Sequence, residues 1–220
     1  MVNIDMLEKT QYFADIEKYF FVRFDDKTIL NKPTGDFFYD PWIIKDEYKG
    51  TMWEEILSTL PEPQGEARII VMEPGTTYMA HSDIDDRWHL NLQGNESYLI
   101  DLDNLDMHSL HKDGYWYTMD AGRKHVASNF GSIDRIQLVV RQLLKPTVEK
   151  DLVEVTIKPT KEKFDYRYQF DKHISPWLNK ANKEGVMKDF AHNGSSVSFK
   201  VVKEALKDLN LTDDFKITTS

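Results

Sequence analysis

Three side chains that can bind a metal ion stand in the middle of the sequence. His81 and Asp83 lie two residues apart, so in an extended backbone both side chains leave the same face and can converge on one ion. His125 is the best candidate for a third ligand, because it follows a strand-like run and the turn-forming residues 120–122 and opens another strand-like segment. Two imidazoles and one carboxylate leave half of an octahedron open, and this arrangement suits a non-haem Fe(II) oxygenase.

Two strand-like segments carry polar side chains that could surround such an ion. Residues 87–93 alternate strictly, with Arg87 and His89 on the polar face. Residues 135–141 show a similar alternation that begins with Arg135. If both polar faces turn inward, they line a polar cavity beside the metal. A guanidinium offers a planar fork for carboxylates, so we expect Arg135 to hold the distal carboxylate of an anionic cosubstrate.

The elements that must position these residues are short strands. Many short strands with turn signals at close intervals indicate a β-sandwich or a jelly roll. We therefore expect a mainly β protein whose core covers residues 67–145, with flanking helices outside it. The expected strands cover residues 67–72, 77–81, 87–93, 97–101, 115–119, 125–128 and 135–141.

We expect the segment before this core to be helical or irregular. Residues 1–66 would pack on the core, and their first part has a loosely helical rhythm that could also break into a strand near Phe20. Thr51 and Glu54 form a capping box ahead of a short helix that Pro61 stops.

The segment after the core is more charged, and we expect residues 146–220 to form a small, mostly helical C-terminal extension. Ser175 followed by Pro176 favours the start of a helix. A second helix is expected over residues 196–209, where apolar residues repeat at helical spacing. Residues 153–157 could still add a strand.

The composition excludes several classes of protein. A formal net charge of −9 offers no basic stripe for phosphates and argues against nucleic acid as a partner. The absence of cysteine excludes disulfides, thiolate metal sites and cysteine nucleophiles. The N-terminal residues are charged too early to form a signal peptide, and no apolar run approaches the roughly 20 residues of a membrane span. We therefore expect a soluble protein without a membrane partner and, by default, a cytoplasmic one.

Together these motifs resemble the aspartyl/asparaginyl β-hydroxylase family of Fe(II)- and 2-oxoglutarate-dependent oxygenases, including its proline-hydroxylating relatives. The resemblance covers roughly residues 69–141. It rests on a proline-glycine turn, an HxD motif, an RxH motif, and a late histidine and arginine at the family's spacing. In this chain these are Pro74 and Gly75, His81 to Asp83, Arg87 to His89, His125 and Arg135.

The resemblance implies a double-stranded β-helix, cupin-like core and an oxygenase site. It implies that the late arginine, here Arg135, grips 2-oxoglutarate, and that Arg87 and His89 also contact this cosubstrate. The residues that would hold Fe(II) are the two ends of the HxD motif and the late histidine: His81, Asp83 and His125.

Two features depart from the family pattern. Gln137 stands where a histidine is common, which leaves the metal ligands intact and alters the polarity of the pocket. Residues 95–114 form a longer insertion than expected, which could be an extra loop that covers the substrate. We expect specificity to reside in this insertion and in the C-terminal segment, because loops on a rigid scaffold usually decide it.

The implied reaction is hydroxylation, with O2, of an amino acid or of a protein side chain of the proline, aspartate or asparagine type, with release of succinate and CO2. A competing hypothesis is a non-catalytic jelly-roll module that binds a metal or a dicarboxylate for sensing or assembly. A third is a cupin enzyme that uses a metal without 2-oxoglutarate, such as an isomerase or a direct dioxygenase. The sequence leaves the substrate and the oligomeric state open.

Several of these residues have a plainer interpretation. Arg87 could instead form an ordinary salt bridge with Asp85 or Asp86, and His89 could be a satisfied core histidine.

The remaining histidines and the tryptophans favour structural interpretations. His108 and His111 have the spacing of a metal pair on a helix, but their charged surroundings favour a solvated loop. His173 and His192 lack a partner pattern, which favours surface positions. Four tryptophans are expected in the core rather than on a substrate platform: Trp42, Trp53, Trp88 and Trp116.

Overall fold

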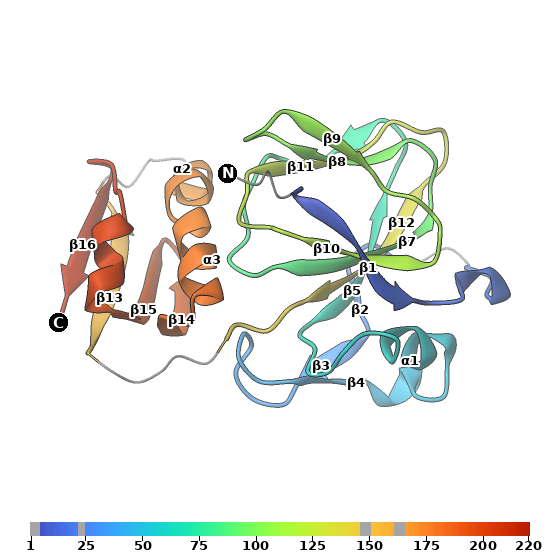
Figure 1. The fold of residues 1–220 in the computed structure, drawn as a ribbon, viewed down its shortest axis with the longest axis horizontal. Helices are drawn as coiled ribbons and strands as arrows, with labels where there is room; N and C mark the ends of the chain where they lie inside the picture. Colours follow the sequence, from blue (N-terminus) through green and yellow to red (C-terminus); the bar gives the residue numbers. More distant parts are fainter. Residues whose placement is uncertain (1–4, 22–24, 146–150, 161–165) are drawn as a thin grey trace.

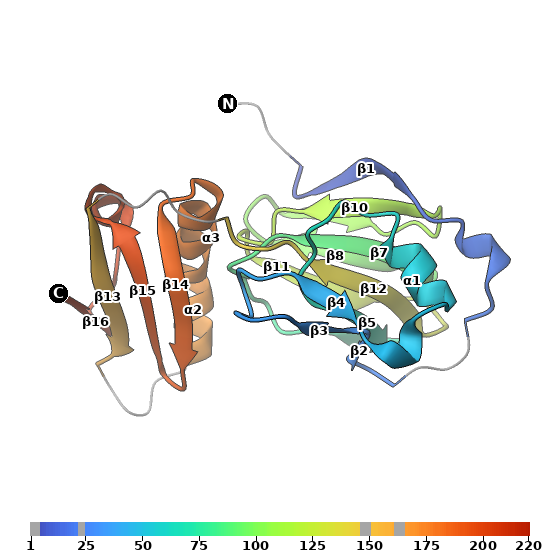
Figure 2. The ribbon, with the colours of Figure 1, turned by 90° about the horizontal axis from the view of Figure 1, so that it is seen from below.

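The computed structural model describes residues 5–21, 25–145, 151–160 and 166–220. Their secondary structure is mainly β, in several antiparallel sheets with few helices, as the sequence predicted. Figure 1 shows two parts side by side, a β core that ends with strand β12 and a smaller C-terminal unit. Figure 2 shows the same separation from a second direction.

The larger sheet of the core has six strands in the order β1-β10-β7-β12-β5-β2, and all neighbouring pairs are antiparallel. Strands β7 and β12, which carry the predicted polar faces, are its central pair. The strands are β1 (Leu7–Phe13), β2 (Thr28–Ile29), β5 (Ala67–Met72), β7 (Arg87–Gln93), β10 (Tyr115–Met119) and β12 (Arg135–Arg141).

The smaller sheet has four strands in the order β6-β11-β8-β9. Side chains of both sheets line a single cavity, so the sheets enclose a shared interior. The strands are β6 (Thr76–Thr77), β8 (Ser97–Asp101), β9 (Asp106–Ser109) and β11 (His125–Asn129).

Most of the predicted strands are present. The predicted bounds agree with β5, β7, β8, β10 and β12, and β11 runs one residue further. The strand predicted over residues 77–81 is wrong in extent, because β6 ends at Thr77 and His81 forms only an isolated bridge with His125. Strand β9 lies in the insertion predicted to be a solvated loop. It is an edge strand whose polar and charged residues show no apolar alternation, so the pattern could not reveal it.

The apolar faces of β7 and β12 pack with helix α1 (Met52–Leu57) in one hydrophobic cluster, which includes Leu90, Leu138 and Trp53. Each fully buried aliphatic side chain contributes about 1.5–3 kcal/mol. A slip of one residue in either strand would exchange this face for the polar one, so burial fixes the register that turns Arg87, His89 and Arg135 inward.

Helix α1 begins as its capping box predicted. The Thr51 hydroxyl accepts a hydrogen bond from the Trp53 backbone N–H at 3.3 Å. The Glu54 carboxylate reaches back to the Gly50 N–H at 2.7 Å, one residue before the cap. The tryptophans expected in the core are buried there, apart from Trp88, which is partly buried against it.

The helical rhythm predicted for the first residues is wrong. Leu7–Phe13 form β1, which pairs along β10 and so gains the backbone hydrogen bonds of a sheet edge. Single-turn 3₁₀ helices lie at Ile16–Lys18 and Asp46–Tyr48, and β3 (Asn31–Pro33) pairs with β4 (Trp42–Ile44).

The prediction of a mostly helical C-terminal extension is also wrong. Four antiparallel strands form a sheet in the order β14-β15-β13-β16. The helix predicted over residues 196–209 is absent, and this segment forms strand β15 followed by a 3₁₀ helix at Lys203–Asp208. Every second residue of β15 is buried, so the two-residue period of a strand describes this segment better than the helical spacing does. The strands are β13 (Leu152–Pro159), β14 (Met187–Asn193), β15 (Ser196–Val202) and β16 (Phe215–Thr219).

Two helices of the C-terminal unit lie between its sheet and the β core (Figure 1). They are α2 (Tyr166–His173) and α3 (Ser175–Lys183), and α3 starts at the predicted Ser-Pro pair. The strand considered at residues 153–157 is part of β13. None of the helices in the described ranges combines the length and the apolar composition needed to cross a membrane.

Candidate metal and carboxylate site

The three predicted metal ligands converge. His81, Asp83 and His125 each offer a ligand atom, and these atoms all lie within 4.8 Å of one another. The Oδ2 atom of Asp83 is 3.8 Å from Nε2 of His81 and 4.0 Å from Nε2 of His125. The two imidazole rings are 4.4 Å apart between centroids.

Backbone hydrogen bonds hold the two ligand segments together. His81 and His125 exchange N–H to O=C bonds of 3.0 and 2.9 Å, and the Asp83 N–H donates to the Ala121 carbonyl at 2.7 Å. The segment that follows β6 is therefore fixed against the start of β11. The side chains of His81 and Asp83 meet on one side of this segment, as their spacing predicted.

The orientation of both imidazoles follows from contacts with backbone carbonyls. Nδ1 of His81 lies 2.9 Å from the Met79 oxygen, and Nδ1 of His125 lies 2.8 Å from the Arg123 oxygen. A carbonyl can only accept a hydrogen bond, so each Nδ1 carries the proton and each Nε2 keeps its lone pair. Both lone pairs belong to the nitrogens nearest Asp83.

The charges around Asp83 keep it ionised. Its Oδ1 atom lies 3.2 Å from Nη2 of Arg87, and Oδ2 faces the histidines. Burial by itself would raise the pKa of this carboxyl, but the charge of Arg87 and then of the imidazoles outweighs it and lowers the pKa to about 2. Burial and the neighbouring His81 lower the pKa of His125 to about 4. At neutral pH both groups are in the form that binds a metal.

These donors fit a single divalent ion. Bonds from imidazole nitrogen and carboxylate oxygen to such an ion are about 2.0–2.2 Å, so two donors at right angles around one ion are about 3 Å apart. The separations of 3.8 and 4.0 Å would need to close by about 1 Å when an ion binds, which rotation of the side chains can supply. Two nitrogens and one oxygen form the donor set that leaves positions open for further ligands.

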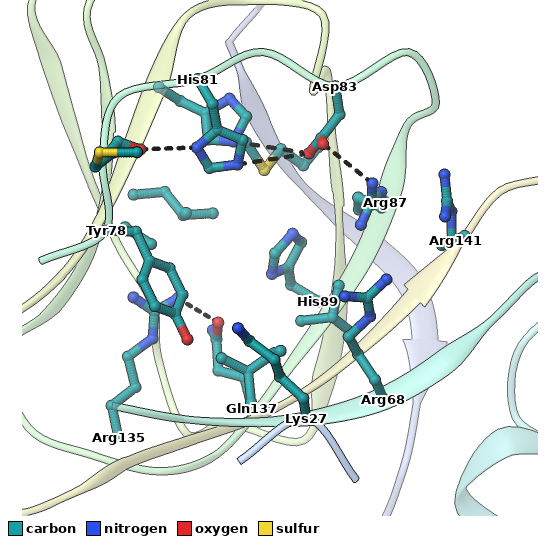
Figure 3. Close-up of a pocket in the computed structure, with 17 residues that line it drawn as sticks. Lys27, Arg68, Tyr78, His81, Asp83, Arg87, His89, Arg135, Gln137 and Arg141 are labelled. Atoms are coloured by element: carbon teal, nitrogen blue, oxygen red, sulfur yellow. Dashed lines mark hydrogen bonds and ion pairs between the residues drawn. The ribbon is translucent and has the colours of Figure 1, made fainter. Parts of the chain in front are cut away.

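The ligands stand at one end of a cavity of about 560 Å³ between the two sheets. Figure 3 shows His81 and Asp83 at one side of it and Arg135 and Gln137 at the other, with His89 between them. The polar faces predicted for β7 and β12 therefore both turn inward, and the cavity is polar where they meet.

Arg135 is a buried cation, and no buried anion lies beside it in the described ranges. Its side chain is 2% exposed, and its nitrogens contact the carbonyls of Tyr98 and Ser128 at 3.3 Å and the amide oxygen of Gln137. In the described part of the chain no carboxylate lies within ion-pair distance of it, and its Nε has no partner. Burial lowers the pKa of Arg135 to about 10, which leaves it charged at neutral pH. Such a charge is costly unless an anion occupies the cavity.

His89 is buried, but it is not the satisfied core histidine that the sequence left open. Neither ring nitrogen has a hydrogen-bond partner among the described residues. Burial, together with the charges of Arg135 and Arg87, lowers its pKa to about 3, so the ring is neutral and can donate one hydrogen bond into the cavity.

Unpaired polar atoms gather around this cavity. Buried polar groups are nearly always hydrogen-bonded, so a cluster without partners indicates a ligand with several acceptor oxygens. A dicarboxylate meets this requirement. Among the described residues the unpartnered nitrogens lining the cavity are Nε of Arg68, Arg87 and Arg135, both ring nitrogens of His89, and Nε2 of Gln137.

The salt bridge considered for Arg87 is also present. Nη2 of Arg87 lies 2.9 Å from Asp85 as well as 3.2 Å from Asp83. Asp86, the other carboxylate considered, does not contact Arg87. It accepts a hydrogen bond from the Asn179 amide of helix α3. The guanidinium of Arg87 thus holds the Asp83 carboxylate in place while its Nε faces the cavity.

Sequence reasoning missed two arginines of the site. Arg68 on β5 and Arg141 at the end of β12 both line the cavity. Arg141 continues the inward alternation of Arg135, Gln137 and Val139. The two-residue alternation in the sequence could therefore have predicted that its side chain faces the cavity. Arg68 lies on a strand whose residues are mostly apolar, and only the pairing of β5 with β12 brings it to the site.

The other histidines form no comparable group. His108 is part of β9 and His111 is exposed, and within the described ranges neither belongs to a cluster of potential metal ligands. His173 is partly buried at the end of α2. His192 on β14 lines a second cavity, between the core and the C-terminal unit.

The comparison with known families covers this site. Residues 51–144 match the family model described as aspartyl/asparaginyl beta-hydroxylase. No curated protein matches the chain. The matched segment includes the three convergent ligand residues and Arg135, and it bears out the resemblance read from the motifs. This part of the chain is similar to the aspartyl/asparaginyl β-hydroxylase family, and the match suggests hydroxylase activity.

Proposed function

We propose that the protein is an Fe(II)- and 2-oxoglutarate-dependent dioxygenase that hydroxylates an amino acid or a protein side chain of the proline, aspartate or asparagine type. The observation that carries this proposal is the position of Arg135, a buried cation with no carboxylate beside it among the described residues. It lies across one cavity from His81, Asp83 and His125. The family match supports hydroxylation as the reaction.

The order of the strands supports a double-stranded β-helix, or jelly roll, as the scaffold. Strands β5, β7, β10 and β12 belong to the larger sheet, and β6, β8, β9 and β11 belong to the smaller one. The chain thus crosses repeatedly between two antiparallel sheets that share one interior, which is how jelly rolls close a cavity.

In the proposed enzyme His81, Asp83 and His125 hold Fe(II), which with bound 2-oxoglutarate and O2 supplies the oxidising chemistry. The rest falls to the protein's own residues. Arg87 keeps Asp83 ionised and oriented through its 3.2 Å contact. Nδ1 of each histidine keeps its proton and donates it in a hydrogen bond to a backbone carbonyl, which leaves the lone pair of Nε2 available.

The opposite end of the cavity would bind the cosubstrate. Arg135 pairs with the distal carboxylate of 2-oxoglutarate, and the neutral ring of His89 donates a hydrogen bond to a cosubstrate oxygen. Burial of Arg135 excludes water from this end and strengthens both contacts. Per turnover, one 2-oxoglutarate and one O2 become succinate, CO2 and the hydroxyl group added to the substrate.

The test is formation of succinate from 2-oxoglutarate by the iron-loaded protein under air. We expect succinate from the wild type and a large increase in the 2-oxoglutarate concentration needed for half-maximal rate in Arg135→Met. Lys9→Met is the control, because Lys9 on β1 is a cation that pairs with Asp113 at 2.8 Å outside this cavity. Binding of iron and 2-oxoglutarate without any succinate would favour the sensor or assembly module instead. An unchanged dependence on 2-oxoglutarate in Arg135→Met would refute the role of Arg135.

A further inference from the structure

Tyr78 directs its phenol into the cavity at the end where the cosubstrate would bind. The residue lines the cavity, and its hydroxyl oxygen is buried without a hydrogen-bond partner among the described residues. Figure 3 shows Tyr78 near Arg135 and Gln137, the two residues that line the end far from the metal ligands. Buried hydroxyls without a partner are rare in folded proteins, so this one points to a ligand that completes its hydrogen bonding.

Contacts with one strand hold the phenol and the guanidinium of Arg135 near each other. The Tyr78 N–H donates to the Ala127 carbonyl at 2.9 Å, and Nη1 of Arg135 donates to the carbonyl of the next residue, Ser128, at 3.3 Å. Both acceptors belong to β11. The Tyr78 ring also packs against the hydrophobic cluster that includes Leu99. Neighbouring residues of β11 thus anchor the Tyr78 backbone and the Arg135 side chain.

The phenol of Tyr78 is a hydrogen-bond donor at neutral pH. Burial, followed by the charge of Asp26, raises the pKa of Tyr78, and the charges of Arg135 and Arg68 offset this rise only in part. The hydroxyl therefore keeps its proton and can donate it to an anion. The effect of the Arg135 charge on Tyr78 agrees with their shared place in the cavity.

Arg135 alone does not supply enough donors for a buried carboxylate. A guanidinium has five N–H donors, and a carboxylate has about four acceptor positions. Nη1 of Arg135 donates to the carbonyls of Tyr98 and Ser128, and Nη2 donates to the Gln137 amide oxygen. The Nε–H and one proton of Nη2 remain, which satisfy about two of the four positions. Two donors without partners among the described residues can fill the others, the Tyr78 hydroxyl and Nε2 of Gln137.

We propose that Tyr78 is a further binding residue for the cosubstrate, whose phenol donates a hydrogen bond to the distal carboxylate of 2-oxoglutarate beside Arg135. The contact forms only with an acid that has a carboxylate at this position, so Tyr78 selects 2-oxoglutarate over 2-oxo acids with an apolar end. In the ligand-free protein the same hydroxyl is a buried polar group without a partner, which costs stability. The inference rests on the proposed function and adds a residue to the cosubstrate end of that site.

The first test compares two acids by calorimetry on the protein loaded with redox-inert Zn(II). Tyr78→Phe should bind 2-oxoglutarate about 10- to 100-fold more weakly than the wild type, the loss expected for one hydrogen bond to a charged group. 2-Oxopentanoate has the same length without the distal carboxylate, so the variant should bind it like the wild type. The control is Tyr12→Phe, because Tyr12 packs on the hydrophobic cluster outside this cavity, and it should bind both acids like the wild type. Unchanged affinity for 2-oxoglutarate in Tyr78→Phe, or an equal loss for both acids, would overturn the proposal.

The second test is thermal unfolding of the ligand-free protein. Tyr78→Phe removes a hydroxyl without a partner and keeps the ring, so its melting temperature should equal or exceed that of the wild type. A lower melting temperature would show that the hydroxyl supports the fold and would overturn the binding role. If the wild type binds 2-oxoglutarate and Tyr78→Phe binds it equally well, this inference fails and the proposed function stands. If the wild type does not bind 2-oxoglutarate, the proposed function has failed.

Discussion

Nε2 of His125 lies 4.0 Å from Oδ2 of Asp83, although His125 opens a strand of the smaller sheet and Asp83 belongs to the loop ahead of β7. Two sets of backbone bonds produce this proximity: the exchange between His81 and His125, and the bond from the Asp83 N–H to the Ala121 carbonyl. Main-chain contacts thus position the three candidate metal ligands relative to one another. Such preorganisation reduces the cost of ordering them around an ion.

Replacing Arg135 should affect the stability of the ligand-free protein and the binding of 2-oxoglutarate in opposite ways. The ligand-free protein carries the cost of a buried charge without an anion, so Arg135→Met should leave its melting temperature unchanged or raise it. A ligand at about 100 times its Kd stabilises a protein by about 2.7 kcal/mol, and this gain from 2-oxoglutarate should disappear in the variant. Thermal unfolding with and without 2-oxoglutarate measures both quantities. A lower melting temperature combined with full stabilisation by 2-oxoglutarate would contradict the role given to this residue.

His89 should make the ligand-free protein sensitive to acid. Its pKa is about 3 in the folded protein, and an unfolded histidine has a pKa of about 6.5. Between these values the unfolded chain takes up a proton that the folded protein does not. The stability that His89 contributes is therefore complete above about pH 6.5 and falls as the pH drops toward 3.

The variant His89→Gln lacks this titration. Between pH 7.5 and pH 5 the wild type should lose about 2 kcal/mol more stability than the variant, from the slope of about 1.4 kcal/mol per pH unit for one proton. Urea unfolding at the two pH values provides the comparison. The same loss in both proteins would show that His89 is not held neutral in the fold.

Helix α3 should support the metal ligands from outside the core. Lys183 lies 3.1 Å from Asp86 and 2.6 Å from Asp120, and Asp86 accepts a hydrogen bond from the Ala121 N–H at 3.2 Å. Ala121 in turn fixes the backbone of Asp83. We expect Lys183→Ala to weaken Fe(II) or Zn(II) binding about 10-fold, the lower end of the range known for groups that orient ligands.

Lys180 on the same helix provides the matched control. Its partners, Asp208 at 3.0 Å and Glu184 at 3.9 Å, both belong to the C-terminal unit. Lys180→Ala should therefore bind metal like the wild type in equilibrium dialysis. An equal decrease in both variants would mean that the helix acts through general stability and not through Asp86.

Local patterns in the sequence were sufficient to predict which residues converge at the candidate site. The two-residue spacing of His81 and Asp83 and the strict alternation of β7 survive in the structure, because both depend only on an extended backbone with one buried face. The same alternation in β12 turned Arg135 toward the cavity. These are features that a few consecutive residues determine.

Features that depend on distant partners were not predictable in the same way. Residues 7–13 form strand β1 because they pair with the edge of β10. Apolar and polar residues do not alternate cleanly along β1, so the sequence alone did not predict a strand. Lys183 and Asp86 meet only because the C-terminal unit docks on the core. The second cavity has the same origin, since Arg141 and Phe190 line it from the two parts of the chain.

The most direct test of the central claim is anaerobic addition of Fe(II) and then 2-oxoglutarate to the purified protein, followed by visible absorption. We predict a metal-to-ligand charge-transfer band from chelated 2-oxoglutarate in the wild type and in His111→Ala, whose replaced histidine is exposed and outside the site. The band should be absent in His81→Ala. A wild type that binds no iron and shows no band, or a band that persists in His81→Ala, would contradict the assignment of this site.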